Sequence, residues 1–196
     1  MSMTVKRKRD VDTPRVFMHK LADIRGGVSV AASELGGDFL REGAILSAPV
    51  NGITHVVKTA QVVAEVAASG KAIKVKKLHN FKVGDIITSA LGKAAHAITA
   101  INDSGKEYDE LTIGTAIGAL AIGDVIVEAK AEATGEATGE TSSKSELKYE
   151  PQSVNGTGKP FDPKSNINTD AWVIGVTKGN ICPAFIAEKL RGIINL

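Results

Sequence analysis

The chain has few of the residues that would place it in a specialised class of protein. Cys182 is its single cysteine among 196 residues, which excludes an intramolecular disulfide and any multi-cysteine metal site. The net charge of +2 is too small to indicate nucleic acid or an acidic membrane as a partner. Aromatic residues make up only 4% of the chain, so small aliphatic side chains must build the core. Such a core buries less apolar area per residue, and we expect oligomerisation or docking on a larger surface to compensate.

Signals for export and for membrane insertion are also missing. A short basic cluster near the start consists of Lys6, Arg7, Lys8 and Arg9. Acidic residues and a proline follow it, where a secretory signal peptide would have an apolar stretch. The longest apolar run, residues 111–127, is interrupted by glycines and by Asp124, so it is a poor membrane span. We therefore expect a protein with no signal peptide and no transmembrane segment.

Composition divides the chain into four segments. We expect residues 1–15 to be a flexible basic arm, either a solubilising tail or a contact to an acidic partner. Residues 16–130 should form a β-rich core. Residues 131–170 contain the low-complexity run ATGEATGE and many small polar residues, which predicts a long exposed loop. Residues 171–196 should form one or more closing strands and a helix packed on the core.

Hydrophobic patterning predicts a mainly β fold. Residues 72–76 alternate apolar and charged side chains, which is the pattern of a half-buried strand. Residues 95–101 and 108–113 are further predicted strands. Strands of this length fit a small β-barrel or a β-sandwich equally well. A short amphipathic helix should close the chain, with Ile186, Leu190, Ile193 and Ile194 on one face.

An apolar-Gly-Asp-apolar phrase occurs twice. It reads VGDII at Gly84 and Asp85, and IGDVI at Gly123 and Asp124; a looser copy at Gly43 lacks the aspartate. Glycine supplies a positive φ, and aspartate accepts hydrogen bonds from nearby backbone N–H groups. We interpret the phrase as a structural turn at the rim of a small barrel. The alternative is that the two aspartates form a carboxylate pair for acid–base work or for a metal.

Other candidates for chemistry are weak. His79 precedes the first turn and is better interpreted as a cap of that turn than as a ligand. None of the four histidines has the spacing of a metal site. Cys182 has no neighbouring histidine, which favours a small buried residue. The sequence predicts no catalytic residue, no metal and no cofactor, and hence no enzyme.

Several phrases resemble the head fiber or head decoration proteins of tailed bacteriophages and prophages. They are EGAIL (42–46), PVNGI (49–53), KAIKVKKLHNFKVGDII (71–87), ITAI (98–101) and TIGTAIGALAIGD (112–124), together with residues 172–196. The resemblance covers roughly residues 40–127 and 171–196. It includes neither the first 15 residues nor the Thr-Gly-Glu repeat.

The resemblance implies a non-catalytic virion protein that is made in the bacterial cytoplasm and attached to the outside of the capsid. Its partner would be the major capsid protein or another virion component. A homo-oligomer is expected, with a trimer favoured. The alternative is a free carbohydrate- or cell-surface-binding module of a mobile element, for which one Trp and two Tyr are thin support.

Overall fold

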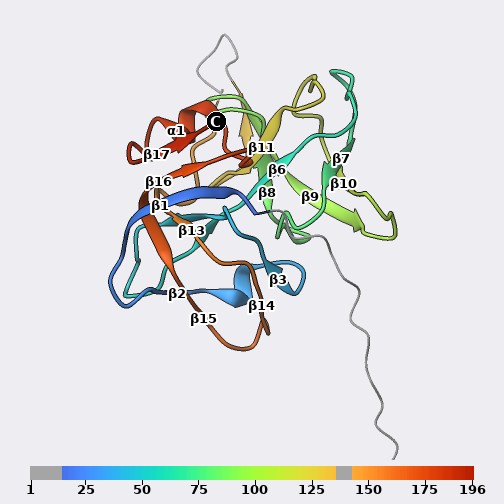
Figure 1. Cartoon of the computed structure of the whole chain (residues 1–196). Coiled ribbons are helices and arrows are strands. Elements are labelled where there is room, and N and C mark those ends of the chain that lie inside the picture. Colours follow the sequence, from blue (N-terminus) through green and yellow to red (C-terminus); the bar gives the residue numbers. More distant parts are fainter. Residues whose placement is uncertain (1–14, 136–142) are drawn as a thin grey trace, which may run out of the picture.

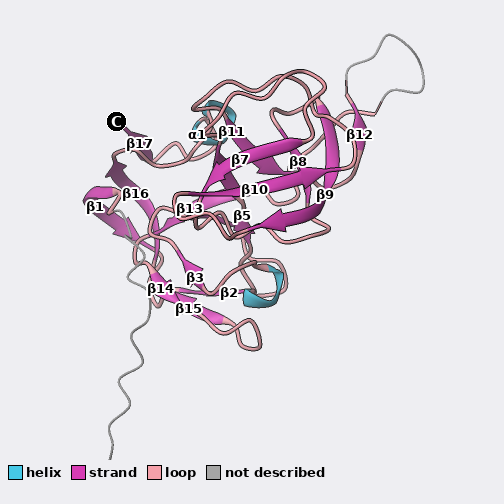
Figure 2. Cartoon of the chain, turned by 90° about the vertical axis from the view of Figure 1, so that its right-hand side faces the viewer, coloured by secondary structure: helices cyan, strands magenta, loops and turns pink. Residues whose placement is uncertain are grey.

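The computed structural model describes residues 15–135 and 143–196, and it folds them almost entirely into β-strands (Figure 1). The basic arm at Lys6, Arg7, Lys8 and Arg9 lies outside the described residues. Two larger sheets form the body of the molecule, and two short ribbons extend one side of it (Figures 1 and 2). The prediction of a mainly β protein is therefore confirmed. In the described part of the chain, no helix has the length and apolar character needed to cross a membrane.

The first sheet curls on itself and encloses the largest apolar core. Its strands, all antiparallel to their neighbours, run in the order β6 (Thr59–Gln61), β11 (Val125–Glu128), β8 (Ile86–Thr88), β9 (Ala94–Asn102), β10 (Tyr108–Ile113) and β7 (Ala72–Lys76), with β12 (Ala133–Thr134) beside β9. The two end strands meet where Val62 pairs with Val75 and the Val63 N–H donates to the Lys74 carbonyl at 2.9 Å. The sheet is thus a half-barrel in which a single bridge joins the two end strands, β6 and β7.

Alternation within the strands explains why this sheet curls around a core. In β7, Ile73 and Val75 are fully buried, whereas Lys76 is exposed on the other face. Because successive side chains of a strand point to opposite faces, one face becomes continuous and apolar. The enclosed cluster is aliphatic except for Phe81, as the scarcity of aromatic residues predicts. Its members are Ala60, Val62, Val66, Ile73, Val75, Phe81, Ile87, Ile98, Leu111, Ile113, Ile117, Leu120 and Ile126.

The second sheet combines the first and last parts of the described chain. Its order is β1 (Phe17–Asp23), β16 (Ala171–Thr177), β13 (Pro151–Asn155), β4 (Ile45–Ser47) and β5 (Val56–Val57), and β17 (Ile193–Asn195) pairs with β16 in parallel. Strand β1 lies at one edge. A second core cluster, which includes Ile45, Val57, Val127 and Ile186, packs this sheet against the half-barrel.

Two ribbons complete the molecule at the lower side of Figure 1. One pairs β2 (Val28–Val30) with β15 (Ile167–Thr169), and the other pairs β3 (Phe39–Leu40) with β14 (Lys159–Pro160). A single 3-10 turn, η1 (Ala32–Glu34), lies between β2 and β3. The ribbons cover their own apolar cluster, in which Val30, Ala32 and Leu40 are fully buried.

The predicted loop over 131–170 is wrong for its second half. Residues 151–170 contain β13, β14 and β15, and β13 lies in the middle of the second sheet. Two of the buried side chains of β13 are polar, Ser153 and Asn155. The Asn155 amide donates to the Arg41 and Thr157 carbonyls and accepts from the Thr169 hydroxyl. The hydrogen bonds of Asn155 therefore stabilise a strand that the composition does not predict. The Thr-Gly-Glu repeat lies in part outside the described residues.

The closing helix is shorter than its apolar pattern predicts. Helix α1 spans Ala184–Ala187, directly after Pro183, and Ile186 and Leu190 are buried as expected. The prediction that Ile193 and Ile194 continue the same helical face is wrong, since both lie in β17. Backbone pairing with β16 takes the place of further helical turns, and Ile194 points away from the core with 59% of its surface exposed.

Candidate functional site

The three glycine turns share one backbone geometry. The φ values of Gly84, Gly123 and Gly43 are 93°, 97° and 83°, a region that favours glycine. At the first turn, the Gly84 N–H donates to the Ile98 carbonyl at 2.9 Å, and the Ile98 N–H donates to the Asp85 carbonyl at 2.8 Å. Each turn thus joins the ladder of a neighbouring strand at the point where the next strand begins.

The other two turns repeat this pairing. Val62 exchanges the same two hydrogen bonds with Gly123 and Asp124, at 2.9 and 2.8 Å. Asn155 does so with Gly43 and Ala44, at 2.8 Å in both cases. The looser copy therefore has the turn without the aspartate, which shows that the backbone geometry does not require the carboxylate.

The two aspartates make the same local contact but have different surroundings. Asp85 Oδ2 accepts from the Lys82 N–H and Asp124 Oδ2 from the Ala121 N–H, both at 2.8 Å. The Asp124 turn is exposed, whereas Asp85 is buried and also contacts Lys58. The structure thus gives each carboxylate its own turn and its own partners, and it does not bring the two together as a pair.

Asp85 belongs to a buried charged cluster. Lys58 Nζ lies 2.6 Å from Asp85 Oδ2 and 3.4 Å from Glu128 Oε1. The three side chains are only 1%, 5% and 2% exposed. Lys148 Nζ, at the edge of the cluster, donates to the same Glu128 oxygen at 2.8 Å. We call Lys58, Asp85 and Glu128 the buried triad.

The cluster is incompletely satisfied. Glu128 Oε2 is buried and has no hydrogen-bond partner. Desolvation raises the pKa of Glu128, in spite of the opposing charges of Lys58 and Lys148. The pKa of Lys148 is also raised, since its hydrogen bond to Glu128 outweighs the effect of its partial burial. A carboxyl group in this position is suited to holding or passing a proton.

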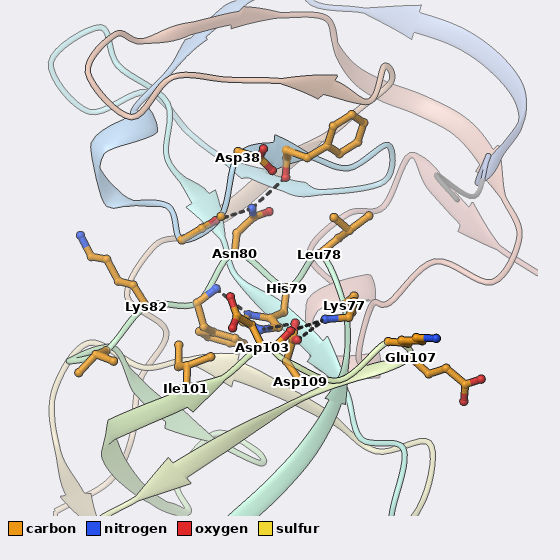
Figure 3. A pocket seen from close by; sticks show the side chains of 16 residues that line it. Asp38, Lys77, Leu78, His79, Asn80, Lys82, Ile101, Asp103, Glu107 and Asp109 are labelled. Atoms are coloured by element: carbon orange, nitrogen blue, oxygen red, sulfur yellow. Dashed lines mark hydrogen bonds and ion pairs between the residues drawn. The ribbon is translucent and has the colours of Figure 1, made fainter. Parts of the chain in front are cut away.

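A pocket of about 920 Å³ lies between the half-barrel and the 36–39 segment (Figure 3). It is lined by residues 36–39, 77–83, 101, 103, 106, 107 and 109. The Asn80 amide points to the 36–39 segment and donates to the Gly36 and Phe39 carbonyls, at 3.0 Å each. Asn80 adopts a positive φ of 58° to do so. This side chain therefore holds the wall of the pocket together.

The floor of the pocket is a second charged group. Lys77 Nζ lies 2.6 Å from Asp109 Oδ1, and His79 Nε2 lies 3.4 Å from Asp109 Oδ2 (Figure 3). His79 Nδ1 accepts the Phe81 N–H at 2.9 Å, so the proton of a neutral ring is on Nε2 and faces Asp109. Burial raises the pKa of Asp109, but the hydrogen bonds from His79 and Lys77 outweigh it, and the pKa lies below its usual value. His79 thus holds the backbone directly before the first turn, which agrees with a structural role for this residue.

A smaller pocket of about 480 Å³ lies beside β1 and includes Arg15, Lys20 and Glu42. The Lys20 ammonium lies 5.2 Å from the centre of the Phe17 ring and 5.3 Å from that of Trp172. The indole N–H of Trp172 donates to Asp170 at 2.7 Å. The aromatic groups at this end of the molecule are therefore engaged by side chains of the protein.

Comparison of the chain with protein-family models, curated proteins and solved structures found no match. Within residues 15–135 and 143–196, no group of three or more His, Cys, Asp or Glu side chains is arranged to hold a metal ion. Cys182 is partly buried, and desolvation raises its pKa to about 11, so its thiol is held in the protonated form.

Sequence reasoning identified Asp85 but missed its two partners in the buried triad. Lys58 follows two valines and precedes Thr59-Ala60, and Glu128 ends the apolar run of β11. A lone charge beside β-branched residues was the available signal. It is a weak one, since a charge at that position more often faces solvent than the interior.

Proposed function

We propose that the chain is a non-enzymatic structural protein of a bacteriophage virion, a head fiber or capsid decoration protein that docks on the major capsid protein. The proposal rests on where the residues that resemble that family lie in the structure. Those around Gly43, Gly84 and Gly123 make the same turn three times, and residues 72–76 form β7 of the half-barrel. The resemblance therefore lies in the scaffold, as it should for a protein whose task is structural.

The surface offers a place for docking. Of the ten exposed large hydrophobic side chains among the described residues, five lie on adjoining strands of the second sheet or at its end. They are Met18, Leu21, Ile174, Ile194 and Leu196. Exposed apolar side chains that gather on one part of a surface favour a protein interface. We assign this apolar end, formed by β1, β16 and β17, to contact with the capsid.

Cosedimentation tests the proposal directly. Capsids assembled from the major capsid protein of the same phage genome are pelleted with increasing amounts of the purified chain. Saturable co-pelleting at a fixed ratio to the capsid protein is the expected result. A chain that stays in the supernatant at all concentrations would contradict the proposal. Light scattering after size exclusion measures the oligomeric state in parallel, and we expect a homo-oligomer, with a trimer favoured.

A matched pair of variants locates the contact. Leu21→Asp places a charge in the apolar end, and Ile122→Asp places one on an equally exposed position of the half-barrel, 63% and 70% exposed respectively. We expect the first to weaken co-pelleting at least 10-fold and the second to leave it unchanged, because only the first charge would be desolvated by the capsid. Equal effects of both variants would contradict the assignment of the surface.

A further inference from the structure

The buried triad has the geometry of a reaction centre and not only of an ion pair. A lysine amine and a carboxyl group face each other at 2.6 Å in a site closed to solvent. A second carboxyl group touches the same amine at 3.4 Å, and its other oxygen is buried without a partner. Burying ionised groups costs several kcal/mol for each ion, even when they are paired. A reaction that removes two of the charges would relieve that cost.

We propose that Lys58 and Asp85 join spontaneously in an intramolecular amide bond, with Glu128 as the group that carries the proton. The site is a self-modification centre that uses residues of this chain alone. It needs neither an oxidant nor a cofactor, and it does not depend on whether the chain is a virion protein.

The step balances as the loss of one water. In the closed site, a proton passes from the Lys58 ammonium to the Asp85 carboxylate, which leaves a neutral amine and a neutral acid. The Nζ lone pair attacks Asp85 Cγ, and the C–N bond forms. Glu128 takes a proton from the nitrogen and returns it to the departing hydroxyl. The C–O bond breaks, water leaves, and Glu128 ends in the state in which it began.

Geometry supplies the proximity that free amines and acids lack in water. An Nζ that lies 2.6 Å from a carboxylate oxygen is about 3–3.5 Å from the carbon of that group, the distance of a near-attack arrangement. Intramolecular placement of this kind corresponds to an effective concentration of about 10⁵–10⁸ M, which lowers the barrier to condensation. The raised pKa of Glu128 supports its role, because a carboxylate that binds a proton more readily than usual is a better base toward the nitrogen.

The position of the bond fits a structural purpose. Lys58 lies between β5 of the second sheet and β6 of the half-barrel, and Asp85 lies at the rim turn directly before β8. The crosslink would therefore fix the junction of the two sheets to the wall of the half-barrel and close a loop of 27 residues. With one cysteine the chain cannot form an intramolecular disulfide, so a covalent crosslink within it must be of another kind.

Mass spectrometry of the folded, purified chain tests the proposal. The intact mass should be about 18 Da below the mass of the sequence, one water, and should stay so after denaturation, because an amide is covalent. Trypsin should release one branched peptide that joins residues 42–71 to residues 83–93, with no cleavage after Lys58. A full sequence mass, with residues 42–58 released as a separate peptide, would overturn the proposal. A loss of water confined to residues 83–93 would overturn it as well, since that is a cyclised aspartate.

Variants separate the roles of the three residues. Glu128→Gln keeps the shape of the proton carrier without its acid, and its mass should be that of the unmodified sequence. Asp85→Asn should still react but should lose ammonia, about 17 Da, in place of water. Lys130→Gln is the control, because Lys130 forms an exposed ion pair with Glu146 outside the triad, and its water loss should be retained. If Glu128→Gln is folded by circular dichroism and crosslinks as fast as the native chain, the assignment of Glu128 is wrong.

Discussion

Alanine at Gly43, at Gly84 and at Gly123 would place a side chain in three turns of the same geometry but different surroundings. All three glycines have a φ between 83° and 97°. A Cβ added at Gly84 or Gly123 would meet nothing within 4 Å. A Cβ at Gly43 would lie 2.5 Å from Val16 Cγ2 and 2.6 Å from Asn180 Oδ1. The series therefore separates the cost of the backbone conformation from the cost of overlap.

The magnitudes follow from these two terms. A positive φ costs a non-glycine residue about 1–2 kcal/mol, and alanine regains part of it because it restricts the unfolded chain. We expect a loss of about 1 kcal/mol at Gly84 and at Gly123, which lowers the Tm of a chain of this size by about 2–4 °C. At Gly43, two buried side chains must also move, which adds about 1–3 kcal/mol. The Tm of Gly43→Ala should fall by about 5–15 °C.

Thermal and urea unfolding, followed by circular dichroism, measure the three variants. The m-value should not change, which would show that the comparison concerns the folded state. If Gly43→Ala is no less stable than the other two, the overlap at Val16 and Asn180 is not what excludes a side chain there. If Gly84→Ala and Gly123→Ala cost nothing, the positive φ is not the reason for glycine in this turn.

Three further outcomes follow from the charged and polar contacts. Asp124→Ala removes one exposed hydrogen bond, to the Ala121 N–H, and should cost about 1 kcal/mol in urea unfolding; a loss above about 3 kcal/mol would contradict the local role of that turn. The pKa of Asp109 is lowered in the folded state, so its stabilisation is complete above the unfolded pKa and is lost as the pH falls through the folded pKa. Unfolding of Asp109→Asn should therefore depend less steeply on pH below about 4, and an unchanged slope would exclude Asp109 as a source. Asn80→Ala leaves two carbonyls of the 36–39 segment without their donor and should raise amide exchange in that segment, whereas a local rate equal to that of the native chain would show that the segment is held by other contacts.

The sequence predicts best the elements that local alternation determines. The predicted strands at 72–76 and 108–113 coincide with β7 and β10, because alternating burial is already present in the order of the residues. The glycine turns are recognisable for the same reason, since positive φ and the aspartate contact to the residue three before it are local effects. Local patterns do not predict the closure of the half-barrel, because it depends on the pairing of Val62 with Val75 between the two end strands.

What the sequence does not predict depends on partners that are distant in the chain. Strand β13 has polar buried residues, and the hydrogen bonds of Asn155 go to residues as distant as Arg41. The burial of Lys58 likewise depends on Glu128, which is 70 residues away along the chain. Charge and polarity are normally signs of exposure. They mislead at Asn155 and Lys58, because partners from distant segments satisfy these two side chains in the interior.

The order of the strands has a consequence for the synthesis of the chain. Strands β6 to β12 are consecutive, so the half-barrel has all its strands once residue 134 has left the ribosome. Strand β1 pairs with β16, about 150 residues later, and β4 waits for β13. The half-barrel can therefore fold during translation, whereas the second sheet needs nearly the whole chain. Strand β1 is made first and paired late, and until then its edge is open to other nascent chains.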